Sequence, residues 1–577
     1  MVKKLKCLTK YFGLLIKNYI LLFIFLVLLS VISKIILLIP PFINGEIIDF
    51  VITAEFSRIV YLIFLSLIIL LLEAFFSLLQ TYLGIYLSNH TLIDIKEKLF
   101  RKIIYLRMDE YDKKRSGEYL SRLEGDAETV SSFYIKTIPN MLLNIITMIV
   151  TGFFSVYLSP LLTFVGLISF PISLMINYLF GKKVRTSFLE VRKATDDYSS
   201  VSQQIIIAER AVKRLHIECS VLEYFTEKVS ILTKTSIKSG MISAYGGLLQ
   251  MITSTILELL IMSLACYSII KGNLSIGSYV AFNVYLAQFL TSIREMASMN
   301  LDIQAVLISM ARIDEIMTSI QEQLIESDKT CHLQGDIIID NVEFSYKENL
   351  KVLDKVNLKF DSNTITAIVG TSGCGKTTLL NLVMGIYEPQ RGKIFISGQE
   401  IGTLRLHDLR SNISYVQQDP FFISDTIRNN LLLANQTATD KEIEEACKMA
   451  HIYEMIMSLP QGFETVIEEQ GNNFSSGQKQ RLAIARGILK KAKIFLFDEI
   501  TSDLDGETEK YILKTLFWLS KEHTVIIVAH RITTVENIPR IIVFDKGRNV
   551  QEGKHQELLD HCKEYQKLFK NTEEIRT

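Results

Sequence analysis

Residues 364–378 read TITAIVGTSGCGKTT, and this stretch decides the fold of the C-terminal half of the chain. Residues 364–369 form an apolar, β-prone run, and the helix-forming run LLNLVMG begins at 379. The loop between them matches GxxxxGK[ST] in the strand–loop–helix context that this pattern requires. Its glycines let backbone N–H groups close on phosphates, and the helix N-terminus adds partial positive charge. The stretch therefore predicts an α/β domain that binds a nucleoside triphosphate.

The loop also predicts individual contacts. We expect Lys376 to reach the β- and γ-phosphates and the Thr377 hydroxyl to bind Mg²⁺. Cys374 stands at a helix N-terminus, which predicts a thiol that is acidified and reacts with maleimide unless ATP protects it. The alternative is an inert small residue. The predicted ATP contacts of the loop are Gly370, Thr371, Ser372, Gly373, Cys374, Gly375, Lys376, Thr377 and Thr378.

Two further apolar strands end in polar residues. The run IFLF at 494–497 leads into Asp498 and Glu499. We expect Asp498 to hold Mg²⁺ and Glu499 to polarise the attacking water. The run TVIIVA at 524–529 leads into His530, at the sheet edge where such folds bind ligands.

Composition excludes other classes of protein. The 577 residues carry 62 Lys+Arg and 62 Asp+Glu, a balance that argues against a nucleic-acid partner. Seven scattered cysteines without a CxxC pair argue against a disulfide framework and a structural zinc site. With 49% hydrophobic residues, the chain has enough apolar sequence for a membrane domain beside a soluble one.

The first half contains apolar runs long enough to cross a bilayer. We predict a transmembrane domain over 1–325, followed by a nucleotide-binding domain over 332–577. Its cytoplasmic arms are expected at 88–137 and 182–243, with turns over 111–118, where Gly117 is the expected break, and near 208–218. Pro40-Pro41 is expected to end the first span and Pro171 to kink the fourth. The six predicted spans lie near 19–41, 59–87, 138–158, 161–181, 244–270 and 276–297.

Charge predicts the orientation of the spans. Segment 88–137 holds ten Lys and Arg residues, whereas 41–57 holds none, so the basic arms should be cytoplasmic. Both termini and the nucleotide-binding domain are then cytoplasmic, in a multi-pass protein of the plasma membrane. The basic, amphipathic segment 5–17 is expected to lie in the inner interface.

Three ionisable residues fall within the predicted spans: Lys34, Glu73 and Glu258. Such groups are costly in lipid and commonly face a cavity or a partner. Glu73 and Glu258 lie at similar depth, which makes them candidates for a substrate pathway that favours a cation. The alternative is that they hydrogen-bond locally.

Further motifs in the second half resemble those of ATP-binding cassette (ABC) transporters. NFSSGQ at 473–478 is similar to the family's LSGGQ signature at Ser475, Gly477 and Gln478. Tyr346 resembles the residue that stacks on adenine, and Gln418 the loop glutamine that senses Mg²⁺. Residues 465–471 (TVIEEQG) resemble the exporter-specific loop and SDLD at 502–505 the D-loop, with His530 in the place of the switch histidine. The first half resembles a type IV exporter, and EYDKKRSGEYLSRLEGD at 110–126 its first coupling-helix region.

The resemblance implies a six-helix all-α transmembrane domain followed by an α/β P-loop domain. It implies a half-transporter that uses ATP and Mg²⁺ and exports a peptide, lipid or drug-like substrate by alternating access. Its partners would be a second half-transporter, identical or different, and membrane lipid. An importer on the same fold and a non-transporting ATP-gated regulator or channel remain alternatives.

Two signature positions depart from the family pattern: Phe474 replaces leucine and Ser476 replaces the first glycine. A side chain at 476 could loosen the partner's site, because glycine there permits close backbone approach. The alternative is a harmless variant. Glu499, Gln418 and His530 are all present, so the catalytic half of the site is predicted to be intact.

Overall fold

The computed structural model describes residues 19–114, 116–322, 333, 336–346, 350–468, 471–501 and 504–573. The chain divides into two compact units. The helical unit comprises Met1–Arg101 and Gly117–Met317, and the α/β unit comprises Lys102–Ser116 and Thr318–Thr577. A short piece of the first arm, Lys102–Ser116, therefore belongs to the α/β unit. The predicted interfacial segment 5–17 lies outside the described residues.

Among the described residues, five helical runs are long and apolar enough to cross a membrane. The 48-residue helix α9 carries the apolar run predicted over 161–181, and Pro171 lies inside it. This architecture agrees with the predicted all-α membrane domain. The helices of this unit are α2 (Ile20–Leu37), α3 (Pro40–Ile52), α4 (Phe56–Ile104), α6 (Ser116–Ser121), η2 (Arg122–Asp126), α7 (Ala127–Ser132), η3 (Phe133–Thr137), α8 (Ile138–Leu158), α9 (Pro160–Ile207), α10 (Glu209–Leu215), α11 (Glu218–Ile270) and α12 (Ile276–Thr318).

The first helix ends at Leu37, just before Pro40-Pro41, as expected, and a second helix begins at these prolines. The helix breaks at residues 38–39, and both prolines stand in the first turn of α3, where their missing N–H groups cost nothing. The break leaves the Leu38 carbonyl free, and the buried Tyr285 hydroxyl of α12 donates a 2.8 Å hydrogen bond to it. Gly45 and Gly277 allow α3 and α12 to touch, since a Cβ on Gly277 would lie 1.9 Å from the Gly45 oxygen.

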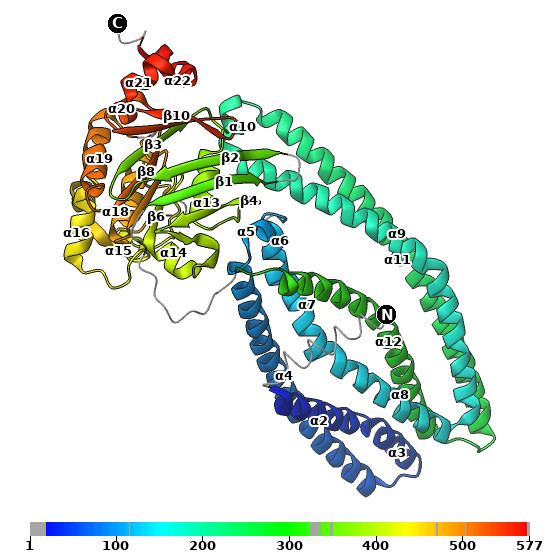
Figure 1. Ribbon diagram of the computed structural model, residues 1–577. Helices are drawn as coiled ribbons and strands as arrows, with labels where there is room; N and C mark the ends of the chain where they lie inside the picture. Colours follow the sequence, from blue (N-terminus) through cyan, green and yellow to red (C-terminus); the bar gives the residue numbers. More distant parts are fainter. Residues whose placement is uncertain are drawn as a thin grey trace. The chain divides into compact units, whose positions relative to one another are not determined.

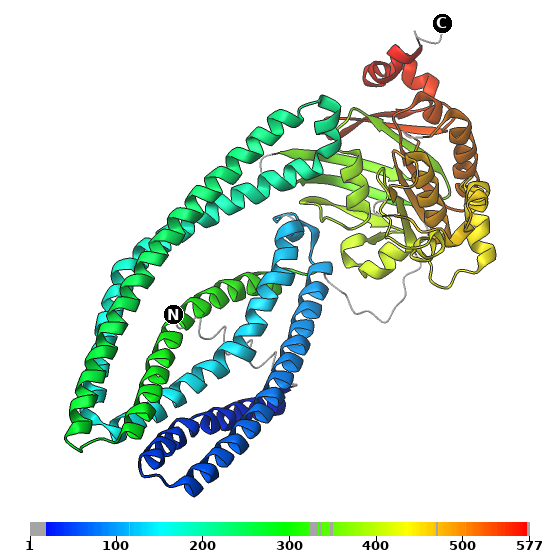
Figure 2. The ribbon, with the colours of Figure 1, turned by 180° about the vertical axis from the view of Figure 1, so that it is seen from behind.

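The turns of the two arms differ in how well they were predicted. In the first arm the turn falls at residues 112–114, within the predicted segment 111–118, but Gly117 itself lies inside α6. The chain leaves helical geometry after α4 and again after the short helix α5 (Met108–Tyr111). In the second arm, α10 forms the tip between α9 and α11, and His216 ends it in the left-handed region at φ 51°. Helices α9 and α11 then lie side by side along their lengths (Figure 1 and Figure 2).

The α/β unit contains two sheets. The antiparallel sheet has the order β2-β1-β4-β5, and the larger sheet has the order β10-β9-β3-β8-β7-β6. In the larger sheet β6, β7, β8, β3 and β9 run parallel, while β10 pairs antiparallel to β9. The strands are β1 (Ile337–Ser345), β2 (Lys351–Phe360), β3 (Ile365–Gly370), β4 (Arg391–Ile396), β5 (Gln399–Glu400), β6 (Ile413–Val416), β7 (Ile494–Asp498), β8 (Thr524–Val528), β9 (Arg540–Asp545) and β10 (Arg548–Gly553).

Burial explains why the central strands are continuously apolar. All residues of β3, β7 and β8 are buried, as expected for parallel strands covered on both faces. The covering helices include α18, which begins in the signature segment, and α19 (Figure 1). The helices of this unit are α5 (Met108–Tyr111), α13 (Lys376–Val383), α14 (Leu406–Asn412), α15 (Ile427–Leu432), α16 (Asp440–Met449), α17 (Tyr453–Ser458), α18 (Ser476–Leu489), α19 (Gly506–Leu519), α20 (Ile532–Val535), α21 (His555–His561) and α22 (Lys563–Glu573).

Candidate nucleotide site and membrane cavity

The predicted site residues follow the carboxyl ends of neighbouring parallel strands. Gln418 follows β6, Asp498 and Glu499 lie at the end of β7, and His530 follows β8. The loop 370–376 leaves β3 and enters α13. Because these strands are adjacent, one sheet edge brings together residues that are up to about 160 positions apart in sequence.

Glu499 and His530 contact each other directly. The Nε2 atom of His530 lies 2.8 Å from Oε1 of Glu499, and both side chains are partly exposed. Glu499 holds φ at 53°, a conformation that non-glycine residues seldom adopt. Its own N–H bonds to the Val528 carbonyl at 3.1 Å, which fixes the bend. The strained backbone and the histidine together orient this carboxylate.

Asp498 has the properties of a cation ligand. It is 4% exposed, and burial raises the pKa of its carboxyl group. The Tyr415 hydroxyl donates to Oδ2 at 3.1 Å and the Thr377 hydroxyl also bonds this carboxylate, while Oδ1 is buried without a partner. An unpaired anionic oxygen in a buried site is costly unless a cation meets it. The residues present therefore fit a magnesium ion.

The phosphate-binding loop adopts the conformation that its glycines allow. Gly373 and Gly375 have φ of 79° and 105°, and a Cβ on Gly370 would lie 2.3 Å from the Phe544 carbonyl. The Lys376 ammonium donates to the carbonyls of Gly370 and Thr371 at 2.9 and 3.0 Å. The loop's own carbonyls therefore hold the lysine in place.

The expected acidification of the Cys374 thiol was wrong. The side chain is 5% exposed, and burial raises its pKa despite the Lys376 ammonium, which lies 3.9 Å from the sulfur. Desolvation of the thiolate outweighs both the nearby cation and the helix N-terminus. The buried position of Cys374 agrees better with the alternative prediction, that this residue is a chemically inert small side chain.

Tyr346 presents its ring beside the loop. The side chain is 49% exposed, and its hydroxyl lies 3.1 Å from the Thr378 hydroxyl of α13. Tyr387 packs at right angles to this ring with centroids 5.3 Å apart, and Phe344 does the same at 5.0 Å. Phe344 and Tyr387 thus hold the Tyr346 ring in place, while about half of the side-chain surface stays exposed to solvent.

The signature segment begins α18. Ser475 is its N-cap and forms a capping box with Gln478, whose side chain accepts from the Ser475 N–H at 2.9 Å. Phe474 is 8% exposed within the hydrophobic core, which explains the aromatic residue there. Ser476 is exposed in the first helical turn, so its position needs no glycine for backbone reasons. Gly477 follows in the same turn, so Ser475, Gly477 and Gln478 share the helix start.

Two other predicted elements are described in part. Gln418 is exposed, and its side chain forms no hydrogen bond with the described residues. In the loop 465–471, the Ile467 N–H bonds to the Asp425 carbonyl at 2.8 Å, so this loop is tied to the segment after Gln418. Ser502 and Asp503 of the D-loop and residues 469–470 lie outside the described part of the chain.

Sequence reasoning missed a cluster of contacts around α5. The Tyr387 hydroxyl donates to Asp112 Oδ2 at 2.6 Å, and the Arg107 guanidinium lies 3.4 Å from Glu388. Leu106 forms an antiparallel bridge with Gln321 in the segment after α12. The next residue, Glu322, accepts two hydrogen bonds from Arg410, at 2.7 and 2.9 Å. Most of these are polar residues in loops, so no local pattern marked them.

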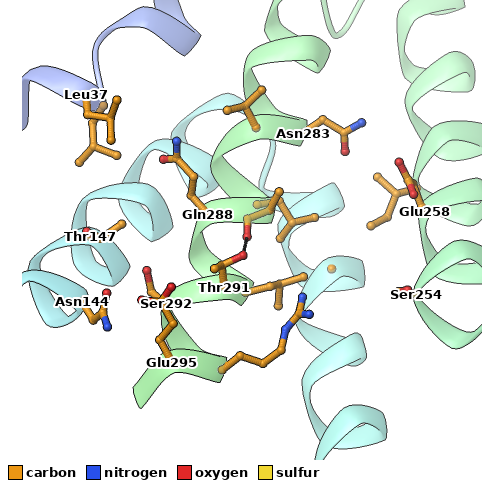
Figure 3. A pocket seen from close by; sticks show the side chains of 18 of the residues that line it. Leu37, Asn144, Thr147, Ser254, Glu258, Asn283, Gln288, Thr291, Ser292 and Glu295 are labelled. Atoms are coloured by element: carbon orange, nitrogen blue, oxygen red, sulfur yellow. Dashed lines mark hydrogen bonds between the residues drawn. The ribbon is translucent and has the colours of Figure 1, made fainter. Parts of the chain in front are cut away.

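The helical unit contains a cavity of about 760 Å³. Glu258 lines it together with Lys34, whereas Glu73 does not belong to the lining. The predicted pairing of the two glutamates in one pathway therefore has no support in this cavity. Figure 3 shows its labelled side chains, which come from α2, α8, α11 and α12.

Comparison with known proteins agrees with this fold and site. The model for the ABC transporter transmembrane region matches residues 23–293, and the ABC transporter model matches residues 353–502. YfiC of Bacillus subtilis, described as an uncharacterized ABC transporter ATP-binding protein, is 30% identical over 555 residues, covering 95% of this chain and 92% of its own. YgaD of the same organism, described provisionally as a multidrug export ATP-binding/permease protein, is 31% identical and covers 85% of each chain.

A solved structure shares the whole architecture. The ATP-bound structure of a bacterial Atm1-family ABC exporter superposes with a TM-score of 0.80, covering 96% of this chain and 98% of that one, at 24% identity. The chain belongs to the ABC transporter family. It combines a membrane domain and an ATP-hydrolysing domain in one polypeptide and functions in ATP-driven export.

Proposed function

We propose that this chain is one half of a dimeric exporter whose two nucleotide sites each require both subunits. The observation that carries the proposal is the Glu499 carboxylate, which His530 holds at 2.8 Å one residue beyond Asp498. A carboxylate held in this way can orient and polarise a water for attack on the γ-phosphate. Tyr346 offers an open aromatic face to adenine, and the loop 370–378 offers its N–H groups to the phosphates.

Three residues would hold Mg²⁺: Thr377, Gln418 and Asp498. Among the described residues, no group of three or more His, Cys, Asp or Glu side chains could hold a metal. The ion would therefore bind together with the nucleotide, and when bound it would neutralise charge on the β- and γ-phosphates. The partnerless Oδ1 of Asp498 is the observation that supports this assignment.

The second subunit follows from the signature segment. The start of α18 is exposed, with Ser475 and Ser476 at the surface. Ser475, Gly477 and Gln478 would present this helix start to the γ-phosphate bound by the partner's loop, where the helix dipole favours an anion. Half-transporters of this family generally work as dimers, and the partner here is a second half-transporter, identical or homologous.

The protein would lie in the plasma membrane with its α/β unit and both termini in the cytoplasm. The ten basic residues of segment 88–137 support this orientation. ATP binding would close the dimer and hydrolysis would release it, so that the membrane cavity alternates between two accessible states. The relatives named for multidrug export support an exported substrate, which we expect to be a peptide, a lipid or a drug-like compound.

Substitution of Glu499 by Gln tests this proposal. The amide keeps the shape and cannot act as a base, so steady-state ATPase activity should fall at least about 100-fold, within the range of general-base catalysis. ATP should then hold the dimer in its closed form, detectable by cross-linking or by trapped nucleotide. Glu454→Gln changes an exposed carboxylate elsewhere in the unit and should leave the activity unchanged. Wild-type turnover in Glu499→Gln would refute the proposal.

A further inference from the structure

The lining of the membrane cavity carries charges that have no partner within the described chain. Lys34 comes from α2, Glu258 from α11 and Arg294 from α12, and none of them forms an ion pair or a hydrogen bond. Glu295, the fourth charged residue of the lining, already has an interaction partner. Three unpaired charges from three helices around one cavity are costly in a membrane domain, unless a ligand or a partner satisfies them.

The same lining contains two unsatisfied amide groups. Asn144 of α8 is 5% exposed, and its Nδ2 atom has no acceptor. Gln288 of α12 has a buried Oε1 atom without a donor. One free donor and one free acceptor are the complement of a secondary amide, which offers one C=O and one N–H. A ligand with a peptide group would satisfy both.

Three hydroxyl groups of the lining are bonded within their own helices, whereas that of the buried Ser292 is not among them. The Thr147, Ser254 and Thr291 hydroxyls donate to the carbonyls of their own helices, at 2.8, 2.9 and 2.8 Å. The remaining surface is largely aliphatic, with Leu37, Leu38, Leu257, Ile261, Val284, Leu286 and Leu290. Specific polar recognition therefore falls mainly to the charged and amide side chains and to Ser292, set in an apolar wall.

The polar groups lie on different sides of the cavity. Figure 3 shows Asn144 and Thr147 on one side of α12 and Glu258 on the other, with Gln288 and Thr291 on α12 between them. A ligand that meets all of these groups must be extended. The volume of about 760 Å³ lies in the range of sites for drug-sized molecules.

We infer that this cavity binds a short apolar peptide with both termini free. The amine would pair with Glu258, the carboxylate with Lys34 or Arg294, and a peptide group with Asn144 and Gln288. Aliphatic side chains would fill the leucine-rich wall. This inference rests on the proposed function, since it names the substrate class of that exporter. It replaces the expected preference for a simple cation, because the unpaired charges of the lining include two cations and one anion.

The test compares three peptides on wild-type protein in nanodiscs without nucleotide. Trileucine, N-acetyl-trileucine and trileucine amide share the same side chains and differ in their terminal charges. Isothermal titration calorimetry should show trileucine binding at least about tenfold more tightly than either blocked peptide, because one ionic contact is lost in each. Equal affinities for all three, or no binding of any, would overturn the inference.

Variants then assign the termini. In Glu258→Gln, acetylation should no longer weaken binding, and amidation should no longer weaken it in Lys34→Gln or in Arg294→Gln. Asn144→Leu should weaken all three peptides alike. Glu73→Gln is the matched control, since it neutralises a glutamate of another predicted span outside the cavity lining and should keep both preferences. Retained discrimination in Glu258→Gln and in both cation variants would contradict the assignment.

Basal ATPase activity on the same preparations separates the two claims. If ATP is hydrolysed and Glu499→Gln abolishes the hydrolysis, while the three peptides bind equally or not at all, the substrate class is wrong and the exporter assignment stands. If wild-type protein does not hydrolyse ATP, the proposed function itself fails.

Discussion

The Tyr387 hydroxyl donates a 2.6 Å hydrogen bond to Asp112, which follows helix α5. The ring of the same tyrosine packs against Tyr346, the predicted adenine contact. One side chain therefore touches both the nucleotide site and the segment of the first arm that belongs to the α/β unit. Burial and the Asp112 carboxylate both raise the pKa of Tyr387, so its hydroxyl stays protonated and can donate at any physiological pH.

Two substitutions of Tyr387 separate these contacts. Phenylalanine keeps the ring and removes the hydroxyl, whereas alanine removes both. The KM for ATP should rise about two- to tenfold in Tyr387→Ala, since an aromatic pair contributes about 0.5–1.5 kcal/mol. It should stay near the wild-type value in Tyr387→Phe. An identical change in both variants would show that the ring contact does not position Tyr346.

Cys374 should react slowly with maleimide at neutral pH, because burial raises the pKa of its thiol. The fraction of thiolate is then small near pH 7, and the labelling rate should increase as the pH rises toward that pKa. Cys219 is exposed and provides the internal comparison. Peptide mapping by mass spectrometry should find Cys219 modified first, and Cys374→Ala should retain ATPase activity. Equal labelling of both cysteines at pH 7 would contradict this geometry.

Magnesium activation should weaken at low pH. The raised pKa of Asp498 means that this carboxyl group takes up a proton at a higher pH than an exposed aspartate, and the proton competes with Mg²⁺. The MgCl₂ concentration for half-maximal ATPase activity should rise between about pH 7.5 and about pH 5.5, by up to about tenfold per unit below the pKa. Asp498→Asn should lose most of the activity at every pH. A magnesium requirement that is the same at both pH values would contradict the assigned role.

Glu509 should be a strong contributor to the stability of the α/β unit. It is 4% exposed, and its carboxylate accepts from the hydroxyls of Thr533, at 2.9 Å, and Thr534, with Arg531 at 3.5 Å. Glu509→Ala leaves these donors without an acceptor and should lower the free energy of unfolding by about 3 kcal/mol.

The only tryptophan of the chain, Trp518, lies in the same helix as Glu509, so its fluorescence can follow urea unfolding of this region. Glu509→Gln keeps an acceptor and should lose less stability than Glu509→Ala. Unchanged unfolding midpoints in both variants would show that the network contributes nothing.

Local sequence predicted the nucleotide site well because its residues form continuous motifs at strand ends. The loop 370–378 and the pair Asp498–Glu499 are recognisable without tertiary information, and the parallel sheet then brings them together. The fold class was also predictable, because a bilayer requires long apolar helices. These parts depend on composition and spacing over short distances.

The predictions that were wrong or incomplete concern residues on which opposing physical effects act, and the local sequence does not show which effect is larger. Pro40 and Pro41 indicated the end of the first helix, but not that they also begin the helix α3. The helix N-terminus favours the thiolate form of Cys374, whereas burial disfavours it. Burial is the larger effect, so the pKa of the thiol is raised.

Glu73 and Glu258 were predicted to lie at similar depth, but only Glu258 lines this cavity, because helix rotation decides where a side chain points. The bond from Tyr387 to Asp112 joins residues 275 positions apart, without a motif at either end.

The central claim is that hydrolysis at Glu499 drives export. Its most direct test is ATP-dependent flux in inverted membrane vesicles, measured with a panel of peptides, lipids and cationic dyes. Vesicles with wild-type protein should accumulate at least one panel member when ATP is added, and vesicles with Glu499→Gln should accumulate none. Equal accumulation in both, or ATP-dependent release from preloaded vesicles, would contradict the account.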